Sequence, residues 1–188
     1  KIKIIVRSNS SPSGWDLGFF RKIIFYFFLR LPNKIVVNSK AFKNEYKKRF
    51  NLTTKYIYNP LNTKYINKAA KEKIRKNFFK NFKETKIIFI GRLVDQKDPM
   101  TFVKALNIIK NKIDFKALII GKGYYYKTLK RFLSENKLKD KIKIINWQKN
   151  PYKYLKTSDL LILTSIYEGL PNVLLEAQHL KKFIISSN

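Results

Sequence analysis

The sequence has 188 residues and is 45% hydrophobic, a content that supports a packed core and excludes a disordered tail. It contains no cysteine, which excludes a disulfide framework and thiolate metal sites and fits a reducing compartment. Its 41 Lys and Arg residues against 12 Asp and Glu residues give a formal charge of +29. Such a charge favours nucleic acid, an anionic membrane or a phosphate-bearing substrate as partner. The basic residues are dispersed along the sequence, so charge alone does not choose among these partners.

Residues 1–62 are typical of the end of a strand-and-helix unit. Their pattern predicts a strand, a helix, a strand, a helix and a short strand closing on a proline turn, at residues 1–8, Leu17–Leu31, Asn33–Ser39, Ala41–Phe50 and Lys55–Pro60. Residues 63–84 are rich in Lys and Asn with weak periodicity, so we expect a linker with a surface helix. We also expect the chain to begin and finish in mid-fold, because it lacks an initiator Met and ends on an apolar run.

The segment Leu17–Leu31 combines many aromatic residues with Arg21, Lys22 and Arg30. It is too short and too interrupted to span a bilayer, which takes about 20 apolar residues. Two placements stay open. The segment could lie at a membrane surface, with its aromatic residues inward and its basic residues at the headgroups, or it could pack as an ordinary helix between the sheet and a neighbouring domain.

Residues 85–188 alternate strictly between strand and helix. Apolar runs predict strands at Thr85–Gly91, Phe115–Gly123, Lys141–Trp147, Asp159–Ser165 and Phe183–Ser186. Helical spacing predicts helices from Pro99, with Asp98 as its N-cap, from Tyr124 to Asn136, from Pro151 to Lys156 and from Pro171 to Leu180. The strands are too apolar to have a wet face, so the pattern predicts an α/β fold with a parallel sheet and helices on both faces.

In parallel sheets of this kind, ligands bind at the carboxyl ends of the strands. This rule points to three loops, Gly91–Asp98, Gly121–Tyr124 and Ser165–Asn172. In the first, Gly91 permits close backbone approach, while Arg92 and Lys97 stand beside a helix N-terminus that favours an anion. Two such cations suit a pyrophosphate, although they could equally be ordinary surface residues in so basic a chain.

The third loop offers a carboxylate, a group of backbone N–H donors and a second carboxylate. Glu168 follows the strand, Gly169 and Pro171 shape a tight helix entry, and the amides of about Leu170 to Val173 face an anion. Glu176 lies on an otherwise apolar part of the helix and suits a sugar hydroxyl. The alternative stays open that Glu176 pairs with a nearby lysine on a solvent face.

The order of these motifs is more specific than any one of them. GR-x4-K after the first strand, then G-x-G, then TSIYEGLPNVLLEA before a last apolar strand resembles retaining glycosyltransferase family 4. Val36–Asn62 is similar to the end of that family's N-terminal domain. The resemblance implies the GT-B architecture of two Rossmann-like domains, with residues 1–62 a remnant of the acceptor-side domain, 63–84 a linker and 85–188 a donor-binding domain truncated at its end.

The resemblance also implies roles for single residues. Arg92 and Lys97 would hold the donor diphosphate and stabilise the leaving group, Glu168 would contact the donor sugar, and Glu176 the ribose hydroxyls. Further implied donor-binding residues are Gly91, Gly121, Gly123, Gly169, Leu170, Asn172 and Val173. One departure is Lys181-Lys182, where the family usually has a small residue and glycine before the strand. For His179, the lone histidine, we expect a packing or surface role.

We therefore expect a cytoplasmic glycosyltransferase, at the inner face of a membrane, that moves a hexose or N-acetylhexosamine with retention. Its donor would be a nucleotide-diphosphate sugar and its acceptor a glycan or lipid-linked hydroxyl in surface polysaccharide synthesis. No cofactor and no metal are expected, since the sequence has one His, no Cys and no DxD-type pair. The alternatives are an inactive or truncated sugar-nucleotide-binding relative and, less favoured, a basic nucleic-acid-binding module, for which no motif is present.

Overall fold

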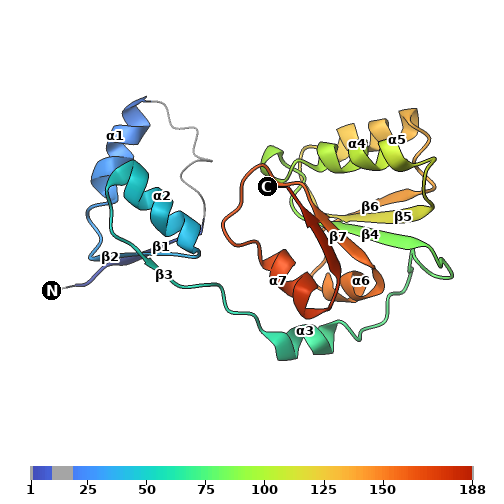
Figure 1. Ribbon diagram of the computed structural model, residues 1–188, viewed down its shortest axis with the longest axis horizontal. Helices are drawn as coiled ribbons and strands as arrows, with labels where there is room; N and C mark the ends of the chain where they lie inside the picture. Colours follow the sequence, from blue (N-terminus) through green and yellow to red (C-terminus); the bar gives the residue numbers. More distant parts are fainter. Residues whose placement is uncertain (1, 10–18, 188) are drawn as a thin grey trace. The chain divides into compact units, whose positions relative to one another are not determined.

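Two compact units make up the part of the chain that the computed structural model describes, residues 2–9 and 19–187. Each unit has a parallel sheet of its own (Figure 1). The first unit holds the residues up to Pro60 together with Tyr167–Pro171, and the second holds Leu61–Ile166 and the residues from Asn172 onward. The α/β class and the parallel pairing predicted from the sequence are thus confirmed.

The first unit contains a three-stranded sheet, among the described residues, in the order β1-β2-β3. Its elements in chain order are β1 (Ile5–Ser8), α1 (Phe19–Phe28), β2 (Lys34–Val37), α2 (Lys40–Phe50) and β3 (Lys55–Tyr56). Each was predicted from the sequence; the first two residues of the predicted helix Leu17–Leu31 lie outside the described residues. A small core of Leu29, Ile35, Val37, Phe42 and Tyr46 joins α2 to the sheet.

The local sequence sets both ends of α2. The Ser39 hydroxyl accepts a hydrogen bond from the Phe42 N–H at 3.1 Å, which satisfies one of the free donors of the first turn. At the other end Asn51 adopts the left-handed conformation, with φ of 53°. Its N–H donates to the Lys47 carbonyl, and the Leu52 N–H donates to the Tyr46 carbonyl. Asparagine tolerates this conformation better than most residues, so the helix stops there.

The second unit is the larger one and contains a five-stranded parallel sheet, again among the described residues, in the order β6-β5-β4-β7-β8. Its elements are α3 (Thr63–Ala69), β4 (Thr85–Ile90), the 3-10 turn η2 (Asp95–Lys97), α4 (Pro99–Ile109), β5 (Phe115–Ile120), α5 (Tyr126–Glu135), β6 (Ile142–Ile145), α6 (Tyr152–Thr157), β7 (Leu160–Leu163), α7 (Asn172–His179) and β8 (Phe183–Ser186). The central strands β4 and β5 pair over six residues each.

Both faces of this sheet are covered, as Figure 1 shows, with α4 and α5 on one side and α6 and α7 on the other. Alternate residues of each strand point to opposite faces. Ile87 and Phe89 of β4 therefore join the core under α4 and α5, whereas Ile88 between them joins the core under α6 and α7. Because both faces are buried, the central strands are continuous apolar runs, which is how the sequence revealed them.

The edge strand β8 departs from the prediction that no strand has a wet face. Phe183 is 79% exposed and Ile185 is 55% exposed. Among the described residues β8 pairs with β7 alone, so its neighbours here cover less of its side chains than they do in β4. Apolar composition alone does not report this, because an edge position is a property of strand order.

Segment 63–84 carries more of the core than its composition indicated. Ile66 and Ala69 of α3 are buried, and Phe79 joins the core under α6 and α7. The Asn150 side chain donates to the Ala69 carbonyl at 2.8 Å, which fastens α3 to the start of α6. The helix expected in this segment is thus present as α3, but two inward positions give too little periodicity to indicate its burial in a Lys-rich sequence.

Candidate functional site

The loop that follows β4 (the β4 loop, Gly91–Asp98) starts at a glycine that lies next to the side chain of a lysine. A Cβ added at Gly91 would lie 3.5 Å from Lys97 Cγ and Cδ, so the aliphatic stem of Lys97 crosses the backbone there. The exposed Arg92 Nη2 donates to Gln96 Oε1 at 2.7 Å. Both predicted cations thus stand on the β4 loop at the carboxyl end of the central strand.

Glycines let the loop after β5 (the β5 loop, Gly121–Tyr125) lie directly against the β4 loop. The Leu93 N–H donates to the Lys122 carbonyl at 2.9 Å, and the Tyr125 N–H donates to the Leu93 carbonyl at 3.1 Å. A Cβ at Gly121 would overlap the Gly91 carbonyl oxygen, and one at Gly123 would come within 2.6 Å of the Leu93 carbonyl carbon. The G-x-G motif is therefore needed for this close backbone approach.

The carboxylate of Asp95 joins the β4 loop to the β5 loop. Asp95 accepts hydrogen bonds from the Tyr124 hydroxyl at 2.5 Å and from the Tyr125 hydroxyl at 2.7 Å, and its own N–H donates to Tyr124 Oη at 2.9 Å. These bonds favour the ionised form, so they lower the pKa of Asp95, Tyr124 contributing most. The bond to Asp95 also raises the pKa of Tyr125. Asp95 fixes the shape of the loop that carries Arg92 and Lys97.

The loop after β7 (the β7 loop, Thr164–Pro171) closes the β4 loop from its other side. The Thr164 hydroxyl is 3.1 Å from the Lys97 carbonyl and 2.7 Å from the Asp98 carbonyl, and the Ile166 N–H donates to the Gln96 carbonyl at 2.9 Å. Since β5 and β7 flank β4 in the sheet, the β4 loop is held on both sides. The structure thus joins the three loops that the strand-end rule selected.

The N-terminus of α4 confirms the predicted N-cap at Asp98, and this cap occupies the place where an anion was expected beside Arg92 and Lys97. The Asp98 carboxylate accepts the Thr101 N–H at 3.1 Å and caps the helix from within the chain. A side-chain carboxylate of this kind satisfies the same donors and dipole that a bound anion would use, so any diphosphate must rely on the side chains and the other loops.

Glu176 occupies a core-facing position of α7. Val173, Ala177 and Leu180 pack under the sheet, and Glu176 lies on the same helical stripe, three residues after Val173. The Tyr152 hydroxyl donates to Glu176 Oε1 at 3.2 Å. Burial raises the pKa of Glu176, which the bond from Tyr152 partly opposes. The alternative of a lysine partner is thus wrong, since the partner is a tyrosine from α6.

Tyr152 belongs to a small aromatic group around this carboxylate. Its ring meets that of Tyr65 from α3 edge to face, with centroids 6.0 Å apart. Burial and the charge of Glu176 raise the pKa of Tyr152 to about 12, so it stays a donor at any physiological pH. Among the described residues only Tyr152 donates to Glu176, so the second carboxylate oxygen can accept from another hydroxyl.

The residues Glu168, Gly169 and Leu170 belong to the first unit, not to the second with the other predicted site residues. A Cβ at Gly169 would lie 2.5 Å from Phe42 Cζ and 2.8 Å from Asn38 Oδ1, so only a glycine allows this contact. Asn172 and Val173 begin α7 in the second unit. The structure brings Gly91, Arg92, Lys97, Gly121 and Gly123 together through hydrogen-bonded loops, and it holds Glu168 with the first unit.

Lys181, which stands where the family usually has a small residue and glycine, adopts an unusual backbone conformation. Lys181 has φ of 56°, in the left-handed region that favours glycine, because α7 ends there and the chain turns into β8.

The lone histidine has a surface partner, since His179 Nε2 is 2.9 Å from Asn67 Oδ1 of α3. This confirms the surface role expected for His179.

Sequence reasoning missed four site residues, Asp95, Tyr124, Tyr152 and Thr164. Asp95 and Tyr124 stand in loops that the strand-end rule had already selected, so a polar residue in such a loop was the available signal. Nothing local indicated the pairing of Tyr152 with Glu176. Among the described residues, no three His, Cys, Asp or Glu side chains are grouped as metal ligands, and metal independence stays a prediction.

Comparisons with known proteins show the family to which the chain belongs. The family model described as Glycosyl transferases group 1 matches residues 70–188. An uncharacterized glycosyltransferase of Methanocaldococcus jannaschii is 28% identical over 197 residues, with 100% of this chain and 48% of that protein covered. The Campylobacter jejuni N-acetylgalactosamine-N,N'-diacetylbacillosaminyl-diphospho-undecaprenol 4-alpha-N-acetylgalactosaminyltransferase is 25% identical over 185 residues, with 94% of this chain and 48% of that protein covered.

The fold is found in solved glycosyltransferase structures. The crystal structure of Anabaena HepE in complex with UDP-glucose has a TM-score of 0.79 at 18% identity, with 98% of this chain and 53% of that chain covered. At this identity the likeness establishes the GT-B fold alone. The chain spans about half the length of the curated relatives that it matches.

Proposed function

The chain belongs to the Glycosyl transferases group 1 family, and from that premise we propose that its second unit binds the nucleotide-diphosphate sugar of a retaining glycosyltransferase. The sugar would be a hexose or an N-acetylhexosamine, and the acceptor a lipid-linked or surface glycan. HepE was solved with UDP-glucose, and the Campylobacter relative is named for a diphospho-undecaprenol acceptor. The whole enzyme's activity is part of the proposal, because this chain covers half of such a protein.

One observation supports the proposal most directly. The β4 loop is fastened on one side to the glycine-rich β5 loop and on the other to the β7 loop, and it carries Arg92 and Lys97. Preorganised cations stabilise charge without reorganising during the reaction. Gly121 and Gly123 let the β5 loop lie directly against the β4 loop, which holds the backbone that carries these cations.

The proposed chemistry follows from where charge develops. Breaking the bond between the anomeric carbon and the diphosphate oxygen leaves positive charge on the sugar and negative charge on the diphosphate. Arg92 would grip the diphosphate with two donors, and Lys97 would add a point charge. Glu176, held by Tyr152, would accept from a ribose hydroxyl, and Glu168 would contact the donor sugar once the β7 loop meets the ligand.

A thermal-shift panel tests the donor site. Wild type, Arg92→Ala and Glu176→Gln are melted with UDP, GDP, ADP and their sugar conjugates, each with EDTA and with Mg²⁺. A ligand at 100 times its Kd stabilises the native state by about 2.7 kcal/mol, so one nucleotide should raise Tm in wild type and lose this effect in both variants. Arg131→Ala on α5, whose side chain is 74% exposed, removes the same charge elsewhere and should keep the response.

The panel also separates the alternatives. A cooperative melt that ignores every nucleotide would favour an inactive or truncated relative over our proposal. A response that requires Mg²⁺ would contradict the proposed metal independence, whereas equal responses in EDTA would support it. Binding of oligonucleotides with sequence preference would instead favour the nucleic-acid-binding module.

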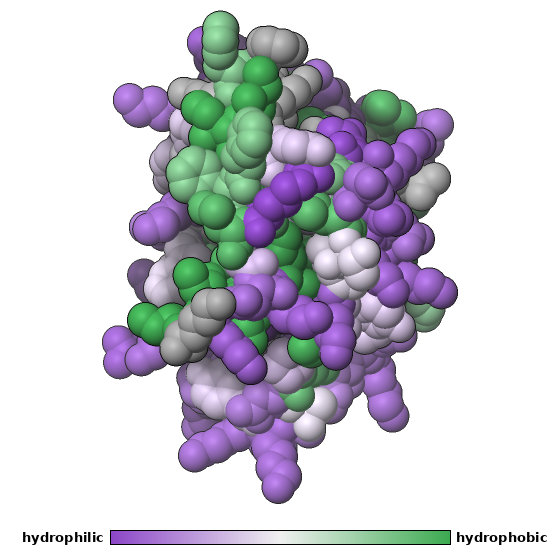
Figure 2. Space-filling view, turned by 90° about the vertical axis from the view of Figure 1, so that its left-hand side faces the viewer, coloured by the Kyte–Doolittle hydropathy of each residue, from purple (hydrophilic) through white to green (hydrophobic). Residues whose placement is uncertain are grey.

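We further propose that the first unit contacts a membrane peripherally through α1, at the cytoplasmic face. The described helices include none long and apolar enough to cross a bilayer. Phe20 is 79% exposed, Phe27 65% and Phe28 64%, and Figure 2 shows hydrophobic residues gathered on the upper part of this face, over α1. Arg30 anchors the end of this helix, since its guanidinium donates to the Phe50 carbonyl at 3.0 Å. An apolar helix on a strongly basic chain suits an anionic lipid surface.

Vesicle flotation tests the membrane contact. The double variant Phe27→Ser, Phe28→Ser should lose binding to vesicles that contain phosphatidylglycerol, whereas wild type should bind these more strongly than neutral vesicles. The control Trp147→Ser, Phe183→Ser removes two exposed aromatic residues of the second unit, which are 61% and 79% exposed. Equal loss in both double variants would refute a specific role of α1.

A further inference from the structure

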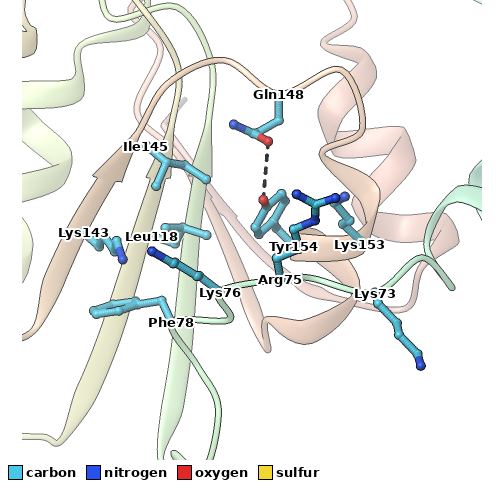
Figure 3. Close-up of a pocket in the computed structure, with 10 residues that line it drawn as sticks. All are labelled: Lys73, Arg75, Lys76, Phe78, Leu118, Lys143, Ile145, Gln148, Lys153 and Tyr154. Carbon is cyan, nitrogen blue, oxygen red and sulfur yellow. Dashed lines mark hydrogen bonds between the residues drawn. The ribbon is translucent and has the colours of Figure 1, made fainter.

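A cavity of about 520 Å³ lies in the second unit, on the face of the sheet that α6 covers and near the edge strand β6 (Figure 3). None of the residues assigned to the donor site lines it. The segment between α3 and β4 forms one wall, and β5, β6 and α6 form the rest. The lining residues are Lys73, Arg75, Lys76, Phe78, Leu118, Lys143, Ile145, Gln148, Lys153 and Tyr154.

The lining contains five cations and no carboxylate. Lys153 has an acidic partner, Glu72 at 3.7 Å. Among the described residues, Arg75, Lys76 and Lys143 form no ion pair. In Figure 3 the Lys76 and Lys143 side chains point toward one another, whereas Lys73 points away. Like charges that converge repel each other, so an anion placed between them would be attracted by both.

The floor of the cavity is apolar and aromatic. Lys143 Nζ lies 5.7 Å from the centroid of the Phe78 ring, and Lys116 Nζ approaches the same ring at 5.3 Å. Leu118 is buried and Ile145 is half-buried beneath these cations. At the rim, the Tyr154 hydroxyl donates to Gln148 Oε1 at 3.4 Å, and the Gln148 amide nitrogen donates to the Asn146 carbonyl at 3.1 Å.

Size and lining together define the ligand class. A phosphate ion fills only part of such a volume, which is within the range of small-molecule sites, roughly 300–1,000 Å³. The cations suit a phosphate group, and the Phe78 ring with its apolar neighbours suits an organic part. We propose that this cavity is a second anion site that binds a phosphate ester with an apolar or planar body, separate from the donor loops.

The chain's overall charge offers a simpler explanation, since clusters of lysine arise by chance among 41 basic residues. The two explanations differ in what they predict. Unspecific attraction depends on net charge and is screened by salt wherever the charges are exposed. A built site depends on particular cations and on the ring beneath them.

Isothermal titration with phenyl phosphate and with inorganic phosphate distinguishes them. We expect saturable binding of phenyl phosphate, several-fold tighter than that of inorganic phosphate, and about tenfold weaker binding in the double variant Lys76→Gln, Lys143→Gln. The control Lys104→Gln, Lys112→Gln removes the same charge from exposed positions at and after α4 and should bind as wild type does. All four side chains are exposed, so unchanged circular dichroism will show that both double variants fold.

Three outcomes would overturn the proposal: equal binding in both double variants, equal affinity for both probes, or loss of binding in Arg92→Ala, which would put the probe at the donor loops. Competition by vesicles that contain phosphatidic acid would support the site and identify a lipid phosphate as its source. Competition by soluble sugar phosphates but not by vesicles would support the site with a soluble source. Because phenyl phosphate is not a nucleotide, failure of the donor-site proposal would not change the outcome of this titration.

Discussion

Replacing Gly121 with alanine should separate the two central strands at the point where the donor loops begin. The added Cβ would overlap the Gly91 carbonyl oxygen and lie 3.1 Å from its carbon and 3.3 Å from Leu93 Cδ2. Backbone atoms cannot give way as a flexible side chain can. The strands must therefore move apart, which strains the hydrogen bond from the Gly91 N–H to the Ile120 carbonyl, now 3.0 Å.

The expected cost combines two effects. Overpacking of a dense core costs about 1–3 kcal/mol, and a weakened backbone hydrogen bond adds about 1 kcal/mol. We therefore expect Gly121→Ala to lower the free energy of unfolding by about 3 kcal/mol, a large part of the roughly 5–15 kcal/mol of an ordinary domain. The matched control is Gly91→Ala, whose Cβ would meet only Lys97 and Phe89 side chains at 3.5 Å. It should change stability by less than about 1 kcal/mol.

The assay must report on the second unit alone, because the two units need not unfold together. Native-state hydrogen exchange of the β4 and β5 amides, read by mass spectrometry, gives the opening free energy of these strands. A neutral Gly121→Ala would refute the close-approach argument. An equal loss of opening free energy in Gly91→Ala would also refute it, because the contacts at the two glycines predict different losses.

Three further predictions concern single residues. Glu176→Gln should raise Tm at neutral pH, because burial raises the pKa of Glu176 and the ionised carboxylate therefore opposes folding. In a pH series, the Tm difference between this variant and wild type should vanish below the ordinary pKa of 4.5. The Tm difference should be larger in a Tyr152→Phe background, which lacks the hydroxyl donor to Glu176. Asp95→Asn should lower Tm at neutral pH and weaken nucleotide binding, and it should converge with wild type as pH falls through the lowered pKa of Asp95; an unchanged Kd would show that the loop keeps its shape without this carboxylate. Lys181→Gly should stabilise the chain by about 1 kcal/mol in urea unfolding, because a lysine at φ of 56° is strained; destabilisation would count against that reason.

The strands and most helices of both units could be predicted from sequence because their signals are local. Ile87, Ile88 and Phe89 form an unbroken apolar run only because both faces of β4 are buried. Ser39 and Asn51 mark the ends of α2 through bonds to residues within one or two turns. Alternation of such elements then fixes a parallel sheet, and the strand-end rule locates Arg92 and Lys97 without any coordinates.

Only the tertiary structure decided which residues far apart in sequence are in contact. The strand order places β4 between β5 and β7, and this order gives Asp95 its two tyrosine donors and Thr164 its bonds to the β4 loop. No local pattern encodes which loops meet, because that depends on how the whole sheet is assembled. The same reason hid the Tyr152 donor of Glu176 and the convergence of Lys76 and Lys143 on one cavity. Residue types at motif spacing determine which chemistry is available, and packing determines which of those groups stand close enough to act together.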